Sequence, residues 1–427
     1  MTLGKSDKAL FVVAQIGQLK QAQELVRSLG LADVEVAILY TRKNRQMPIM
    51  VQAAVDPTII GATHKIEIHP ASNDLSAMAA DFAEKAYSSL LDMVKPQRLF
   101  VCSFERHYAI LCLEAKKRGI PISLFEEGTA ILKNVVPGYK SFTAPTLKTS
   151  ARTIYNRVWK KQPIAKYVFE PVAAALYQIL ILPNLLAKTA WEIYKSPQIQ
   201  ERILERKHMH FLAGWNDFES VYSTNPEIIA SLFPQSEMRE HRPRYENHEE
   251  TTVAQALIEE YAIDGNTAIF ASQRFDMKPE IQIPLVLGIL LHVAQSTGFR
   301  IVIKLHPRES EMVVQVYRNT IGRLGLQHDI ILMEGAHVPA EYLAVNSECP
   351  AVIGISSSTL MYAPKSKPSL RSISIGRVLL ADLAQAGIED AGTRQIRDHV
   401  SILSVIPYIE QFEPGRPQRA ALKQAAE

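Results

Sequence analysis

Two adjacent carboxylates follow a short apolar run in the first third of the chain. They are Glu126 and Glu127, with Gly128 directly after them, and the apolar run PISLF occupies 121–125. A carboxyl group that is partly desolvated beside a like charge has a raised pKa and can act as a general base. Gly128 would let the backbone turn sharply or a substrate approach closely. An ordinary acidic loop has the same sequence, so the motif alone leaves both interpretations open.

A histidine motif follows a second apolar run, RIVIKL at 300–305. It reads His306-Pro307-Arg308. The histidine could bind a phosphate or protonate a leaving phosphate, and Pro307 would fix the direction in which the chain leaves the strand. A structural histidine is the alternative.

Four consecutive hydroxyl residues follow a third apolar run, AVIGI at 351–355, and precede a helical pattern. They are Ser356, Ser357, Ser358 and Thr359. Hydroxyls and free backbone N–H groups at a helix N-terminus can bind a phosphate, although a run of N-cap residues would look similar. Glu341 begins another expected helix, 339–346. It could accept hydrogen bonds from ribose hydroxyls or simply interact favourably with the helix dipole.

The elements that must position these motifs alternate regularly along the chain. We expect strands at 9–14, 34–40, 98–103, 121–125, 267–272, 300–305, 329–333 and 351–355. We expect helices at 18–29, 77–94, 107–118, 252–261, 281–297, 339–346 and after Ser358. Short apolar strands separated by helices predict parallel sheets covered on both faces, which bind ligands beyond the carboxyl ends of their strands. The polar stretch 234–251 predicts an interdomain linker.

Length and composition indicate an ordinary globular protein of two to three domains. The chain has 427 residues, of which 47% are hydrophobic and 21% charged, and its formal net charge is +3. This balance excludes a fibrous protein, a wholly disordered chain and a nucleic-acid coat protein. The three cysteines, Cys102, Cys112 and Cys349, form no CxxC pair, so we expect no disulfide framework and a reducing cytoplasm.

Several common motifs are missing from the sequence. It has no GxxxxGK[ST], GxGxxG after the first strand, HExxH or GxSxG pattern, and no DxD-type pair in an obvious metal-binding loop. We therefore expect a reaction that uses no metal ion.

Taken together, the three motifs resemble those of a known family. LFEEGTA (124–130), KLHPRE (304–309) and GISSSTL (354–360) resemble the D/E-D/E-G, HP and S-S/T motifs of bacterial sialyltransferases. The resemblance is to the polysialyltransferase and lipooligosaccharide sialyltransferase type. It covers about 1–130 and 217–400, and nothing in 131–216 matches.

The resemblance implies an α/β protein of GT-B fold, in which two Rossmann-like doubly wound domains face a cleft. We expect an acceptor-side domain over 1–240, carrying a helical basic insertion at about 131–216. A nucleotide-sugar-binding domain would follow over 250–400, and a C-terminal helix and tail over 401–427.

The resemblance also implies roles for individual residues. Glu127 would deprotonate the acceptor hydroxyl, and Glu126 would support it by raising its pKa. His306, with Pro307 beside it, would contact the phosphate of a CMP-activated sugar, and Glu341 would bind the ribose. The residues that would hold the phosphate are Ser357, Ser358 and Thr359.

These roles imply inversion at the anomeric carbon, with a CMP-sugar donor and no cofactor or metal. The substrate would be sialic acid or a related nonulosonic acid, and the acceptor a capsule or lipopolysaccharide glycan, free or lipid-linked. Further cleft positions follow from topology alone: Gln15 to Gln18 and Ser272-Gln273-Arg274. A CDP-polyol-dependent polymer phosphotransferase and a non-catalytic polysaccharide-assembly protein are the alternatives.

The insertion has a distinctive charge pattern. From Gly128 to Phe169 there are eight Lys and Arg and no Asp or Glu, and an uncharged stretch, 171–187, follows. A basic amphipathic helix before a short apolar helix predicts a monotopic anchor on an anionic leaflet. The protein would then be cytoplasmic and peripherally associated with the inner membrane. A groove for a polyanionic acceptor and a buried core helix are the alternatives, whereas no aromatic platform for nucleic acid is visible.

Overall fold

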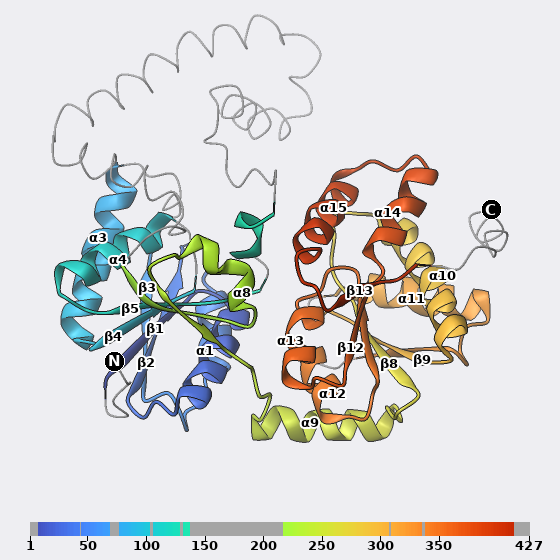
Figure 1. The fold of residues 1–427 in the computed structure, drawn as a ribbon, viewed down its shortest axis with the longest axis horizontal. Helices are drawn as coiled ribbons and strands as arrows, with labels where there is room; N and C mark the ends of the chain where they lie inside the picture. The colour runs from blue at the N-terminus through green and yellow to red at the C-terminus, as the bar shows by residue number, and fades with distance from the viewer. Residues whose placement is uncertain are drawn as a thin grey trace, which may run out of the picture.

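The computed structural model describes residues 7–42, 44–68, 77–102, 106–128, 131–136, 217–306, 309–334 and 338–413. They form two parallel β-sheets with helices on both faces (Figure 1). This is the GT-B arrangement of two Rossmann-like domains, which confirms the expected fold class.

The first sheet has the strand order β3-β2-β1-β4-β5-β6-β7. Its strands are β1 (Ala9–Val13), β2 (Val34–Tyr40), β3 (Ala62–Glu67), β4 (Arg98–Val101), β5 (Ile122–Phe125), β6 (Phe218–Ser223) and β7 (Glu237–Glu240). The helical elements of this half are α1 (Ile16–Leu29), α2 (Met47–Ala53), α3 (Ala77–Val94), α4 (Arg106–Lys117), η2 (Ile131–Asn134), α8 (Pro226–Ile229) and η3 (Ala230–Leu232). Every residue of β1, β4 and β5 is buried, because helices cover both faces of the sheet.

The second sheet has the order β10-β9-β8-β11-β12-β13. Its strands are β8 (Thr267–Ala271), β9 (Arg300–Lys304), β10 (Ile330–Met333), β11 (Ala351–Gly354), β12 (Arg371–Ser374) and β13 (Ile409–Gln411). Its helices are α9 (His248–Glu260), α10 (Pro279–Thr297), α11 (Glu311–Leu324), α12 (Ala340–Asn346), α13 (Thr359–Ser366), α14 (Gly376–Gln385) and α15 (Ala391–Leu403). The order in which strands are added to the sheet reverses between β8 and β11. This topological switch point is where such sheets bind ligands.

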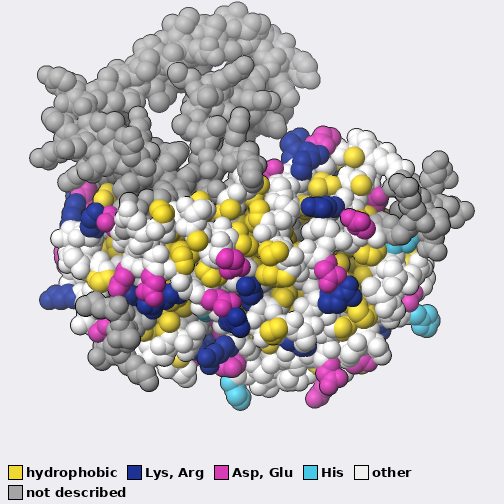
Figure 2. Space-filling model, viewed as in Figure 1, with side chains coloured by type: hydrophobic (Ala, Val, Ile, Leu, Met, Phe, Trp, Pro, Cys, Tyr) yellow, Lys and Arg dark blue, Asp and Glu magenta, His cyan; other side chains and the backbone are white. Residues whose placement is uncertain are grey.

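The two domains share an apolar interface. One cluster of buried side chains continues from the first domain into the second and includes Leu132, Tyr245, Tyr342 and Leu403. The rings of Tyr245 and Tyr342 meet edge to face with centroids 5.2 Å apart. Figure 2 shows apolar side chains exposed in the middle of one face, where the halves meet, with acidic and basic side chains interspersed around them.

The structure contains several elements that the sequence analysis did not predict, among them β3, β6 and β12, and it differs from the expectation in three further ways. The stretch 234–251, expected to be a linker, contains β7 and the start of α9, so the connection itself is shorter. Helix α11 lies between two strands that we expected to follow one another. Within 401–427, expected to be a helix and tail, β13 pairs with β12 as an edge strand.

Helix α10 is long and apolar enough to cross a membrane by length and composition. Most of its apolar side chains, among them Val286, Leu287 and Leu290, are buried in the core of the second domain. This environment is typical of a core helix.

Candidate active site

Glu126 is held inside the protein at the carboxyl end of β5. It is 4% exposed, and its carboxylate accepts hydrogen bonds from the Ser223 hydroxyl, from the Thr224 backbone N–H at 3.1 Å and from the Thr224 hydroxyl at 3.0 Å. Burial raises the pKa of Glu126 to about 7, although these donors and the charge of Lys365 act in the opposite direction. Glu126 is therefore anchored between β5 and the neighbouring strand β6, away from solvent.

Glu127 is only half-buried and lies against the start of α1. Gln18 Nε2 donates to Glu127 Oε2 over 3.5 Å, and Gln18 is itself fixed because its Oε1 accepts from the Ala14 N–H at 2.6 Å. A methyl group on Gly17 would come within 3.5 Å of Glu127 Oε1. Of the two adjacent acids, Glu127 is the one that a ligand can reach.

Gly128 connects this loop to the second domain. Its backbone N–H donates to the Tyr362 hydroxyl oxygen, on α13, at 2.7 Å. Its φ of +59° lies in the left-handed region, where an L side chain is strained even though a Cβ would meet no atom within 4 Å. The chain then enters η2, where Ile131 and Leu132 are buried and η2 packs against α15. The loop is thus held between the domains.

The hydroxyl motif at the start of α13 forms a connected cluster with Glu341. The Thr359 hydroxyl donates to Glu341 Oε1 at 2.9 Å, and the Ser357 hydroxyl donates to Thr359 Oγ1 at 3.1 Å. The Ser356 N–H donates to Gln273 Oε1 at 2.7 Å, which ties the end of β11 to the end of β8. The structure therefore joins three of the expected donor-binding residues, Glu341, Ser357 and Thr359, and places them at the switch point of the sheet.

Ser358 and His306 are half-buried. Ser358 is the N-cap residue of α13 and makes no side-chain capping bond. His306 follows β9 by two residues, while Pro307 lies outside the described residues. The expected proximity of His306 to the hydroxyl cluster stays a prediction.

Lys304 is a buried cation that was not among the predicted site residues. It ends β9, is 3% exposed, and donates from Nζ to the Leu305 carbonyl at 2.9 Å. Burial lowers its pKa to about 8, with Glu341 opposing this shift and Lys20 adding to it. Lys20 comes from α1 and forms an ion pair with Glu250 of α9, so it crosses from one domain to the other. The sequence feature that could have indicated Lys304 is its position as a charged residue at the end of the apolar strand β9.

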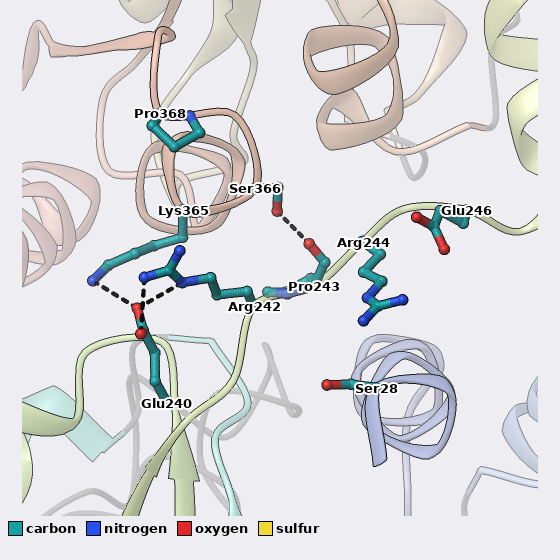
Figure 3. Close-up of a pocket in the computed structure, with 9 residues that line it drawn as sticks. All are labelled: Ser28, Glu240, Arg242, Pro243, Arg244, Glu246, Lys365, Ser366 and Pro368. Carbon is teal, nitrogen blue, oxygen red and sulfur yellow. Dashed lines mark hydrogen bonds and ion pairs between the residues drawn. The ribbon is translucent and has the colours of Figure 1, made fainter. Parts of the chain in front are cut away.

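A separate pocket of about 490 Å³ lies at the connection between the domains (Figure 3). Its lining residues are Ser28, Glu240, Arg242, Pro243, Arg244, Glu246, Lys365, Ser366 and Pro368. Arg242 donates two hydrogen bonds of 2.9 Å to Glu240, and Lys365 Nζ lies 3.7 Å from the same carboxylate. None of the residues selected from sequence lines this pocket.

In the part of the chain that the structure describes, no group of three or more His, Cys, Asp or Glu residues is placed to hold a metal ion.

The family model described as Alpha-2,8-polysialyltransferase (POLYST) matches residues 9–369. The chain belongs to this family. It is accordingly a sialyltransferase-type glycosyltransferase, a class that uses a nucleotide-sugar donor and a glycan acceptor. A comparison with curated proteins finds no match.

Several solved structures are similar to this polysialyltransferase-family chain. UDP-GlcNAc 2-epimerase from Neisseria meningitidis, bound to UDP-GlcNAc, is 14% identical with a TM-score of 0.49, over 93% of this chain and 90% of that chain. UDP-GlcNAc 2-epimerase from Methanocaldococcus jannaschii is 11% identical with a TM-score of 0.45, over 98% and 91%. UGT73P12 from Glycyrrhiza uralensis, complexed with glycyrrhetinic acid 3-O-monoglucuronide, is 10% identical with a TM-score of 0.48, over 95% and 81%.

Proposed function

We propose that this protein transfers sialic acid or a related nonulosonic acid from a CMP-sugar to a bacterial surface glycan of the capsule or lipopolysaccharide type. The transfer inverts the anomeric carbon and needs no metal ion. The observation that carries the proposal is the 2.7 Å hydrogen bond between Gly128 and Tyr362. It joins the loop that bears the acidic pair to the helix that begins at the hydroxyl motif.

The donor side of the site lies in the second domain. A phosphate at the start of α13 would meet backbone N–H groups and the hydroxyls of Ser357, Ser358 and Thr359. Lys304 and His306, from the end of β9, add positive charge for the phosphate as it leaves. Because Lys304 is buried, its charge would act through a low dielectric and stabilise the developing phosphate strongly. Glu341, which accepts a hydrogen bond from Thr359, would bind the ribose next to this group.

The acceptor side lies in the first domain. Glu127 can meet an acceptor hydroxyl because its side chain is partly exposed, whereas the carboxylate of Glu126 is enclosed by Ser223 and Thr224. The base would come from one domain and the site of the leaving phosphate from the other. The two would therefore lie on opposite sides of the anomeric carbon. A single displacement in this geometry inverts the configuration.

We also propose that the protein is cytoplasmic and binds the inner-membrane surface through its basic insertion. Residues 137–216 of this insertion lie outside the described residues, so the proposal depends on the sequence pattern. Eight basic residues without an acid would attract anionic lipids, and the apolar stretch 171–187 would enter the interface. The acceptor would then be a lipid-linked glycan.

Titration calorimetry with CMP and with CDP, in the presence of EDTA, tests the donor site. We expect CMP to bind in EDTA, and we expect His306→Ala to weaken binding by about tenfold or more, the loss of roughly one charge-assisted hydrogen bond. His328→Ala, at an exposed position after α11, is the matched control and should bind CMP normally.

A preference for CDP would favour the CDP-polyol phosphotransferase. Absence of binding of both nucleotides would favour the non-catalytic assembly protein. If CMP binds as expected, the anomeric configuration of the transferred sugar, read by NMR, decides between inversion and retention.

A further inference from the structure

Helix α13 carries residues of both halves of the site. Thr359 is its first residue and belongs to the hydroxyl cluster, while Tyr362 lies three residues later and accepts the Gly128 N–H. Residues three apart are neighbours on one face of a helix, and three residues rise by about 4.5 Å. The hydroxyl cluster and the anchor of the acidic loop are therefore about one helical turn apart.

The hydrogen bond to Tyr362 acts on the backbone of Glu127 itself. The Gly128 N–H belongs to the peptide plane that also contains the Glu127 carbonyl, so fixing this N–H fixes that plane. Glu126 is anchored on the other side of Glu127 by Ser223 and Thr224. Glu127 thus lies between one anchor from its own domain and one from the other domain.

The helix that bears Tyr362 is firmly placed. The Ser372 hydroxyl donates to the Leu360 carbonyl at 2.7 Å, and the Tyr408 hydroxyl donates to the Met361 carbonyl at 2.9 Å. Tyr362 is 3% exposed, and the charges of Glu126 and Glu127 join its burial in raising the pKa of its hydroxyl well above the usual value. The hydroxyl is therefore neutral at physiological pH and close to both carboxylates.

We infer that Tyr362 is a positioning residue that sets the Glu127 carboxylate relative to the donor phosphate across the domain interface. This inference rests on the proposed role of Glu127 as the base. Because the anchor comes from the donor-binding domain, Glu127 takes its working position only when that domain is docked against the loop. The phosphate site and the base are then aligned by a single rigid element.

The test compares Tyr362→Phe with Tyr87→Phe. Tyr87 is equally buried and hydrogen-bonds His107 at 2.8 Å, within the first domain. We expect Tyr362→Phe to lower kcat by about 10- to 100-fold, as small misplacements of a catalytic group do, while CMP binding changes by less than about threefold. Tyr87→Phe should keep a normal kcat. A normal kcat for Tyr362→Phe, or a parallel loss of CMP binding, overturns the inference.

A double-mutant cycle separates positioning from general destabilisation. If Tyr362 acts through Glu127, adding Tyr362→Phe to Glu127→Gln should change the residual turnover by less than about twofold, because the two residues work as a unit. An equal fold-loss in both backgrounds shows that Tyr362 acts independently of Glu127 and overturns the inference.

Hydrogen exchange supplies a readout that needs no turnover. Tyr362→Phe should increase amide exchange in peptides covering 122–132 by about tenfold, the protection expected from one hydrogen bond, whereas Tyr87→Phe should not. Unchanged exchange overturns the inference even if the protein is inactive with every CMP-sugar. Inactivity of the wild-type protein together with increased exchange would reject the proposed function and leave the anchoring of the loop by Tyr362 established.

Discussion

Replacing Glu126 with glutamine should make the protein more stable at alkaline pH. In the unfolded chain this carboxyl group ionises near 4.5, whereas burial raises its pKa to about 7 in the folded protein. Between these pH values the unfolded chain has lost a proton that the folded protein keeps, so the free energy of unfolding falls as pH rises. At about 1.4 kcal/mol per pH unit, the wild-type protein loses about 3 kcal/mol of stability between pH 4.5 and pH 7 through this group.

Glutamine resembles the neutral carboxyl group and cannot ionise. Its carbonyl oxygen can accept from Ser223 and the Thr224 N–H, and its amide group can donate to the Thr224 hydroxyl. Glu126→Gln should therefore match the wild-type stability near pH 4 and exceed it by up to about 3 kcal/mol above pH 7.

Urea unfolding at pH 4.5 and pH 8, followed by fluorescence and circular dichroism, measures this difference. Glu114→Gln is the matched control, since Glu114 is also buried, but Lys117 and Arg118 outweigh the effect of burial and lower its pKa. This control should lose stability at pH 8. The reasoning is refuted if Glu126→Gln is less stable than wild type at pH 8, or if the difference between them does not depend on pH.

Two further predictions concern charge. Lys304→Met should weaken CMP binding by about tenfold or more. The wild-type affinity for CMP should also fall as pH rises through about 8, where Lys304 loses its proton. Calorimetry over pH 6.5–9.5 measures both effects, and the same pH dependence in the two proteins would contradict the prediction. Replacing Arg157, Lys160 and Lys161 with Glu should release the protein from anionic vesicles, because each basic residue near the surface contributes about 1 kcal/mol of attraction. Co-sedimentation with vesicles measures the release, and unchanged binding would reject the membrane proposal.

The sequence pattern was sufficient for most of the buried strands and for several of the long helices, whereas the buried strands β6 and β12 and the amphipathic helices α14 and α15 were not predicted. β2 and α3 have the expected bounds, because β2 is a run of mostly buried apolar residues and α3 repeats its apolar residues at helical spacing. β7, with the sequence EMRE, was missed since an edge strand with no fully buried residue carries no apolar pattern. α11 was also missed, although its apolar residues Val313, Val314, Tyr317, Ile321 and Leu324 have helical spacing and pack in or against the core of the second domain.

The different roles of the residues in the site depend on contacts between distant parts of the chain. The two acids are adjacent in sequence, but Ser223 and Thr224, at the end of β6, enclose Glu126, whereas Gln18 of α1 contacts Glu127. Likewise, nothing near Tyr362 indicates that it contacts Gly128, which lies 234 residues away. The motifs could therefore be located from sequence, whereas the role of each residue within them required the fold.

The most direct measurement of the central claim is turnover and donor binding by Glu127→Gln, with Glu126→Gln beside it. If Glu127 is the base, its replacement should lower kcat by about two to four orders of magnitude and leave CMP-sugar affinity unchanged. Glu126→Gln should retain more activity than Glu127→Gln, because its carboxyl group anchors the loop and does not meet the acceptor. Near-normal turnover by a folded Glu127→Gln protein would contradict the account.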